Sequence, residues 1–161
     1  TILIMTSNAG AQRIVDPKNL GFSASDSPSR DYEKMKSSVM EEIKRNFKPE
    51  FINRIDEIIV FHQLSRENMK EIVDMLAARL NKRCEKQMDI HLTISESLKE
   101  HLVEKYSDRK MGARPLRRAM QTVVEDRLAE EILQGNVKAG DKVTAGYRKN
   151  EVVFTVKEKR V

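Results

Sequence analysis

Three polar residues stand at the ends of predicted apolar elements, and their side-chain types suit the binding of an anion. Asn8 follows the apolar run at residues 1–6, Arg54 lies between a predicted helix and a predicted strand, and Arg114 comes immediately before Pro115. Ligands of α/β sheets bind at the carboxyl ends of strands, where the Asn8 amide is expected. An arginine offers a planar fork of donors to phosphate, and a helix N-terminus favours negative charge. The sequence therefore predicts anion recognition, with the kind of anion left open.

Each of these residues also has an ordinary structural interpretation. Asn8 could cap a helix or form a turn. Arg54 could pair with Asp56 or Glu50. Arg114 could belong to a basic surface patch whose other members are Lys105, Arg109, Lys110, Arg117 and Arg118. The residues alone leave these alternatives open.

The first sixty residues carry the pattern of an α/β lobe. Residues 1–6 and 57–61 are short apolar runs, typical of strands buried on both faces. An apolar stripe at helical spacing predicts a helix over residues 31–47, which Pro49 ends. Residues 16–30, rich in serine, proline and glycine, are expected to form a long loop.

The remaining residues favour helices with a few short strands. Ser65 and Ser95 are expected to cap two helices, and Pro115 to open a third that Gly135 ends. Strands are predicted at 89–94, 143–147 and 152–156, with a turn near Lys149-Asn150 between the last two. The predicted fold class is α+β, with a boundary near residues 62–65 that separates residues 1–61 from residues 62–161.

Composition excludes several classes of protein. No apolar run approaches the roughly 20 residues that span a bilayer, so we expect no membrane partner. A single cysteine, Cys84, cannot form an internal disulfide and fits a reducing compartment. The three histidines and Cys84 show no metal-ligand spacing, and the sequence contains neither a G-x-S-x-G nor a P-loop motif. We therefore predict no metal site, and nothing in the sequence supports a catalytic triad.

The basic character of the chain is confined to its later part. Residues 1–60 hold nine basic and nine acidic residues, so the whole net charge of +5 lies in residues 61–161. This charge would permit a nucleic-acid-binding domain. Both signs are interleaved, however, only 5% of residues are aromatic and none is tryptophan, so no nucleic-acid partner is expected.

Three blocks of the sequence, taken together, resemble a known family. Residues Thr1–Gly10, Phe47–Phe61 and Gly112–Arg118 are similar to consecutive blocks of the Clp/Hsp100 AAA+ ATPases, in the second ATPase module. The resemblance covers essentially the whole chain. It implies that residues 1–61 are part of an AAA+ large lobe and that residues 62–161 are a helix-rich Clp C-terminal small domain with a small β-sheet.

The resemblance also implies roles for single residues. Asn8 matches sensor 1, which positions the attacking water, and Arg54 matches the arginine finger, which reaches the nucleotide of a neighbouring subunit. Arg114 matches sensor 2, which contacts the nucleotide bound by its own subunit. The implied cofactor of the full-length protein is ATP or ADP with Mg²⁺, and the implied assembly is a homo-hexamer.

A short motif in the predicted loop points to one branch of the family. Leu20-Gly21-Phe22 resembles the tripeptide by which unfoldases dock onto the ClpP peptidase, a loop that disaggregases generally lack. The resemblance is thus to ClpC-type unfoldases, which deliver protein substrates, brought in part by adaptors, to ClpP. It implies a location in the bacterial cytoplasm or the chloroplast stroma.

The family's Walker A and Walker B motifs and its pore loop are not in these 161 residues, and the resemblance places them upstream. We therefore expect the isolated chain neither to bind nor to hydrolyse ATP appreciably. We also expect the apolar runs of residues 1–61 to promote self-association. The competing interpretation is a non-catalytic interaction or oligomerisation module, built from the small domain and the docking loop.

Overall fold

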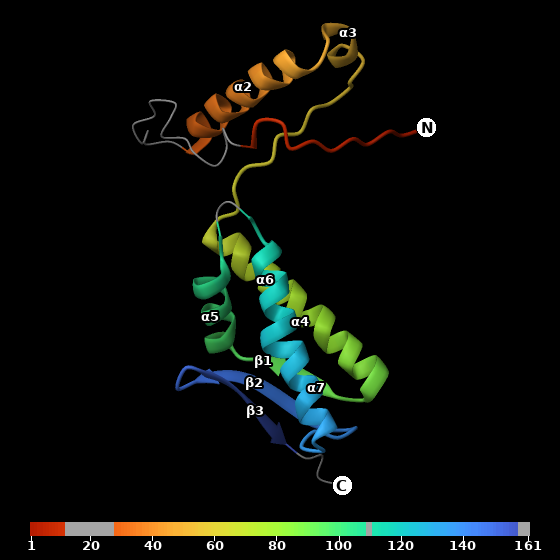
Figure 1. Ribbon diagram of the computed structural model, residues 1–161, viewed down its shortest axis with the longest axis vertical. Coiled ribbons are helices and arrows are strands. Elements are labelled where there is room, and N and C mark those ends of the chain that lie inside the picture. The colour runs from red at the N-terminus through yellow and green to blue at the C-terminus, as the bar shows by residue number, and fades with distance from the viewer. Residues whose placement is uncertain (12–27, 109–110, 158–161) are drawn as a thin grey trace. The chain divides into compact units, whose positions relative to one another are not determined.

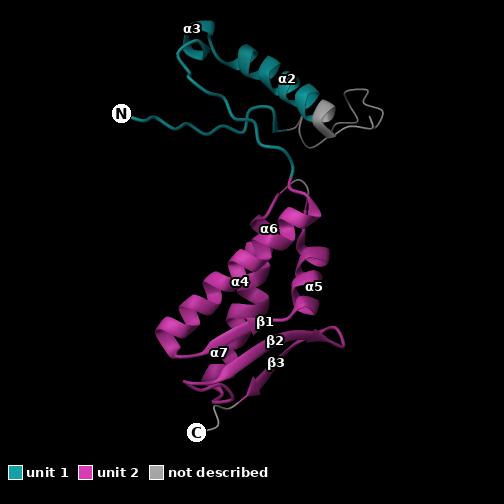
Figure 2. Cartoon of the chain, turned by 180° about the vertical axis from the view of Figure 1, so that it is seen from behind, with its two compact units in different colours: residues 1–63 teal, residues 64–161 magenta. Residues whose placement is uncertain are grey.

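The chain forms two compact units, residues 1–63 and residues 64–161 (Figure 2). The computed structural model describes residues 1–11, 28–108 and 111–157. In the first unit the regular elements are helix α2 (Pro28–Asn46) and the short helix α3 (Pro49–Ile52). The prediction of a helix ended by Pro49 is confirmed in outline, although α2 stops at Asn46 and Pro49 opens α3 instead.

The interior of the first unit is small and gathers around α2. Val39 is buried on this helix, and Val60 is the other buried apolar residue of the unit's described part. Gly10 adopts φ +76°, and a Cβ atom there would meet the side chain of Val39 at 3.0 Å. Tyr32 donates a hydrogen bond from its hydroxyl to the carbonyl oxygen of Val60, at 3.1 Å. These contacts hold residues 10 and 60 against α2.

The two strands predicted in this unit are absent from its described part. Residues 1–8 and 57–61 have no regular secondary structure, and Ile2, Ile4 and Phe61 are at least 80% exposed. A strand needs a neighbour to satisfy its N–H and C=O groups, and no described strand lies in this unit. The expectation was wrong because an apolar run shows the tendency to pair but does not supply the partner.

The second unit combines helices with a three-stranded sheet (Figure 1). Its elements are α4 (Arg66–Met88), β1 (His91–Ile94), α5 (Glu96–Tyr106), α6 (Arg114–Ala119), the π-helix η2 (Met120–Glu125), α7 (Asp126–Leu133), β2 (Lys142–Arg148) and β3 (Glu151–Lys157). The sheet has the order β1-β2-β3, with β1 parallel to β2 and β2 antiparallel to β3. The helices lie on one side of the sheet, which confirms the predicted α+β class.

Local signals set the ends of these elements as expected. The Ser65 hydroxyl accepts from the backbone N–H of Asn68, whose side chain accepts from the N–H of Ser65, so α4 begins with a capping box. Ser95 caps α5 in the same way through the N–H of Leu98. Lys149 and Asn150, with φ of 48° and 64°, make the two-residue turn between β2 and β3.

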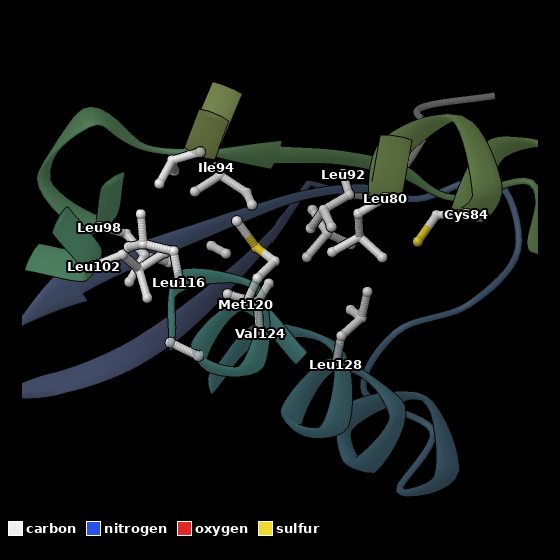
Figure 3. Packing of buried hydrophobic residues seen from close by; sticks show 14 of the residues in the cluster. Leu80, Cys84, Leu92, Ile94, Leu98, Leu102, Leu116, Met120, Val124 and Leu128 are labelled. Carbon is white, nitrogen blue, oxygen red and sulfur yellow. The ribbon is translucent and has the colours of Figure 1, made fainter. Parts of the chain in front are cut away.

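One continuous apolar core holds the second unit together (Figure 3). Leu98 and Leu102 of α5 are fully buried, and Leu116 and Val124 meet them from the helices that follow. Alternate residues of β1 and β2 face this core, which explains the buried-exposed alternation of both strands. No helix in the described ranges is both long and apolar enough to cross a membrane.

The helix predicted from Pro115 to Gly135 contains a feature that its sequence pattern does not reveal. It runs through α6, η2 and α7, and its middle six residues form a π-helix, which begins at Met120 and ends at Glu125. Leu116, Met120, Val124 and Leu128 are all buried, a spacing of four that suits a helix wound more loosely than 3.6 residues per turn.

A histidine in this unit gives the fold a predicted pH dependence. The ring of His101 stacks on that of Tyr147, with centroids 3.6 Å apart, and burial together with the positive charge of Lys105 lowers its pKa, an effect that Glu104 opposes. The folded state therefore prefers the neutral ring. The neutral ring of His101 contributes fully to the free energy of unfolding above the ordinary histidine pKa of about 6.5. This contribution is lost as the pH drops through the lower pKa that His101 has in the folded state.

We expect urea unfolding at a series of pH values to show this loss in the wild-type chain. The variant His101→Gln should lack that part of the pH dependence, because it has no proton to gain. Equal pH profiles for the two proteins below about pH 6.5 would contradict the prediction.

Candidate functional site

Asn8 lies in a tight turn at the end of the first apolar segment. Its carbonyl oxygen accepts a hydrogen bond from the N–H of Ala11 at 3.1 Å, and the neighbouring Ser7 hydroxyl accepts from the N–H of Ala9. The Asn8 side chain is exposed and makes no hydrogen bond to the described residues. The turn thus fixes the backbone of Asn8 and leaves its amide available to a ligand.

Arg54 lies in the turn that follows α3. Its N–H donates to the carbonyl oxygen of Phe51 at 3.1 Å, which continues the turn of the short helix by one residue. Its guanidinium is exposed, and no carboxylate of the described chain pairs with it, so the alternative of an ion pair with Asp56 or Glu50 is not found. The side chain can therefore reach a partner outside its own unit.

Arg114 is the first residue of α6, with Ala113 as the N-cap and Pro115 directly after it. Gly112, at φ +63°, donates to the carbonyl oxygen of Asp108 and sets the sharp entry of the chain into the helix. Arg114 is exposed and forms no ion pair with a described residue. A helix N-terminus disfavours cations, and the first turn of α6 holds no acidic residue to offset the charge of Arg114.

The predicted residues are distributed over both units. Asn8 and Arg54 belong to residues 1–63, and Arg114 belongs to residues 64–161. Within its own unit, each of the three is an exposed polar group without a charged partner in the described chain. The predicted docking tripeptide Leu20, Gly21 and Phe22 lies outside the described residues.

A small basic hollow lies between α4 and the helix that begins at Arg114. Its volume is about 190 Å³, and it is lined by Leu76, Arg79, Leu80, Arg83, Arg117, Met120 and Glu125. Arg83 pairs with Glu125 at 2.6 Å, and this hydrogen bond raises the arginine pKa further. The ion pair connects α4 to the end of the π-helix, so these two charged residues of the hollow have a structural role.

Other chemistries find no support in the described residues. Within residues 1–11, 28–108 and 111–157, no three His, Cys, Asp or Glu side chains are arranged to hold a metal ion. Cys84 is buried, and burial raises the pKa of its thiol, which disfavours the reactive thiolate. The sequence interpretation missed one pair of residues beside Arg54, the stacked rings of Phe47 and Phe51. Their spacing of four residues across Pro49 is the signal that could have found them.

Comparison with family models assigns both parts of the chain. Residues 1–58 match the AAA domain (Cdc48 subfamily), and residues 64–145 match the C-terminal, D2-small domain of ClpB protein. The two matched regions are thus parts of an AAA+ ATPase module.

Individual relatives agree with these matches. The chain is 43% identical over 158 residues to the ATP-dependent Clp protease ATP-binding subunit ClpC of Staphylococcus aureus (strain USA300), an alignment that covers 98% of this chain and 19% of that protein. It is 46% identical over 146 residues to the chaperone protein ClpB of Oceanobacillus iheyensis, covering 91% of this chain and 18% of ClpB.

A solved structure extends the agreement to three dimensions. Hsp104 of S. cerevisiae, in the extended conformation of its casein complex, superposes with a TM-score of 0.76 at 33% identity. The match covers 95% of this chain and 25% of Hsp104. The chain belongs to the Clp/Hsp100 AAA+ ATPases, as the C-terminal D2 region, and spans about a fifth of the length of the curated relatives it matches.

Proposed function

We propose that this chain is the C-terminal part of a ClpC-type unfoldase, which uses ATP hydrolysis to unfold proteins and passes them to the ClpP peptidase. The parent protein works as a homo-hexamer in the bacterial cytoplasm. The observation that carries the proposal is the exposure of Asn8, Arg54 and Arg114 without a charged partner in the described chain, at positions that match three nucleotide-contacting residues of the family. Identities of 43% to a ClpC and 46% to a ClpB support the family, and the choice of the ClpC branch rests on the Leu20-Gly21-Phe22 motif.

In this proposal each residue has a separate task at the nucleotide. Phosphoryl transfer requires positioning and charge stabilisation more than covalent help. Asn8 orients the attacking water through its amide, Arg54 stabilises charge on the nucleotide of the neighbouring subunit, and Arg114 contacts the phosphates within its own subunit. The P-loop that cradles ATP and Mg²⁺ belongs to residues outside this sequence.

The peptidase contact is assigned to Leu20, Gly21 and Phe22. An aromatic and an aliphatic side chain on a loop can enter an apolar pocket of a partner. Six such loops around a hexamer would raise the overall affinity through effective concentration, although each contact alone is weak.

A second candidate function is an interaction module without catalysis of its own. The exposed apolar side chains of Ile2, Leu3, Ile4 and Phe61 favour it, because such a patch is typical of a surface that another protein covers. Both functions can hold, since the same surface would be covered within the parent protein.

A chimera tests the proposed function. This chain would replace the matching segment of S. aureus ClpC, to which it is 43% identical over 158 residues. We expect the chimera to hydrolyse ATP and, with ClpP, to degrade a folded substrate, and a Leu20→Ala/Phe22→Ala version to keep ATP turnover while losing degradation. ATP turnover without any ClpP-dependent degradation would contradict the ClpC assignment, and loss of both activities in a chimera that still forms hexamers would contradict the nucleotide roles.

A further inference from the structure

The rings of Phe47 and Phe51 stack beside the turn that carries Arg54. Their centroids lie 5.3 Å apart with an interplanar angle of 22°, an offset-stacked arrangement. Both side chains are only partly covered, at 36% and 38% exposure, so the apolar core does not account for their position. The two rings contact each other instead at a half-exposed surface.

The ring stack joins the end of α2 to the short helix α3. Phe47 follows the last residue of α2, and its N–H donates to the carbonyl oxygen of Ile43 at 2.9 Å, so its backbone still belongs to the end of that helix. Phe51 lies within α3, whose first residue is Pro49. The helix α3 has four residues and no fully buried side chain, and the ring contact connects it to the end of α2.

Backbone hydrogen bonds connect the stacked residue Phe51 to Arg54. The N–H of Phe51 donates to the carbonyl oxygen of Lys48 at 3.0 Å, and the carbonyl oxygen of Phe51 accepts from the N–H of Arg54 at 3.1 Å. Arg54 is thus one hydrogen bond away from the residue whose ring is stacked. A rotation of α3 against α2 would move the Arg54 backbone with it.

The other end of the same segment is also attached to α2. The hydroxyl of Tyr32 donates to the carbonyl oxygen of Val60, which is buried, at 3.1 Å. The stretch from residue 47 to residue 60 is therefore held at both ends by the one helix, and Arg54 lies in the part next to the ring stack.

We infer that the Phe47–Phe51 stack is a positioning element for Arg54, which fixes the direction in which the guanidinium leaves its subunit. The inference rests on the proposed function, in which Arg54 acts on the nucleotide of a neighbour. An arginine that reaches across a subunit boundary needs a rigid base, since its own unit offers it no ion pair in the described chain. A misplacement of about 1 Å can cost on the order of 100-fold in rate.

The experiment is a double-mutant cycle in the full-length hexamer, read by single-turnover ATP hydrolysis, which resolves slow rates. We expect Phe51→Ala to lower the hydrolysis rate about 10- to 100-fold while the affinity for ATP and the hexamer mass stay unchanged. Phe51→Tyr, which keeps a ring in the stack, should retain the rate within about twofold. Lys48→Ala alters the same turn without touching either ring and serves as the matched control.

The cycle separates positioning from general damage. In an Arg54→Ala background, Phe51→Ala should cause no further loss, because the group it positions is gone. An equal loss in both backgrounds, or an unchanged rate for Phe51→Ala alone, would overturn the inference while leaving the proposed function standing. An unchanged rate for Arg54→Ala alone would overturn the nucleotide role of Arg54 itself.

Discussion

Arg54→Ala in the full-length protein is expected to lower kcat for ATP by about 10³- to 10⁵-fold, equivalent to roughly 4–7 kcal/mol of transition-state stabilisation. The physical reason is that an arginine supplied by a neighbour meets charge that develops on the transferring phosphoryl group. Since the side chain does not hold the ground-state nucleotide of its own subunit, the affinity for ATP should remain within a few-fold. The measurement pairs steady-state ATP turnover with equilibrium binding of a fluorescent ATP analogue.

Two controls make this result specific. Arg45→Ala removes an equally charged and exposed side chain from the last turn of α2 and should leave kcat within about twofold. Mixed hexamers of Arg54→Ala and Asn8→Ala subunits provide the second control, because a site with Asn8 from one subunit and Arg54 from its neighbour should regain the ATP turnover that each variant lacks alone. No gain of turnover on mixing would show that Arg54 acts within its own subunit, contrary to the prediction.

Local chemistry made much of the second unit predictable. Ser65 and Ser95 cap helices because a serine hydroxyl satisfies an otherwise unpaired N–H, a need that depends on neighbouring residues alone. Lys149-Asn150 makes the hairpin turn for a similarly local reason, since a two-residue turn needs positive φ. The helix around Leu116 was also predictable from its apolar stripe, because one face of this helix packs against the core.

In the first unit, local sequence signals did not predict the structure correctly. The apolar runs at residues 1–6 and 57–61 have the composition of strands, yet a strand exists only when a neighbour completes its hydrogen bonds. The π-helix at Met120–Glu125 could not be predicted either, because buried residues that are four apart fit both an α-helix and a wider helix.

The residues of the candidate site were chosen from the sequence, and their role at a nucleotide stays a prediction. Asn8, Arg54 and Arg114 were selected from their places beside apolar segments and from the family resemblance. The structure adds that each is exposed and lacks a charged partner in the described chain. The Phe47–Phe51 stack was missed although the spacing of these residues across Pro49 was a usable signal. The Tyr32 hydrogen bond to Val60 could not be predicted, since it depends on the path of the chain between α2 and residue 60.

The largest expected effect on stability is at the centre of the second unit, where Leu102→Ala should lower the free energy of unfolding by about 2–5 kcal/mol. Leu102 is fully buried among residues of α5, the helix that begins at Arg114 and the sheet (Figure 3), and truncation to alanine would leave a cavity that these packed elements cannot close. For a unit of about 100 residues this corresponds to a fall in Tm on the order of 10 °C or more. Thermal and urea unfolding followed by circular dichroism provide the measurement.

Leu133→Ala is the matched control, because the same atoms are removed from a side chain that is 87% exposed at the end of α7. Its stability should stay within about 0.5 kcal/mol of the wild type, since a surface methyl group has no cavity to leave. A similar loss in both variants would show that unfolding reports on something other than this core. A loss below about 1 kcal/mol for Leu102→Ala would mean that the surrounding helices relax into the space, and that the unit is packed less tightly than its buried residues indicate.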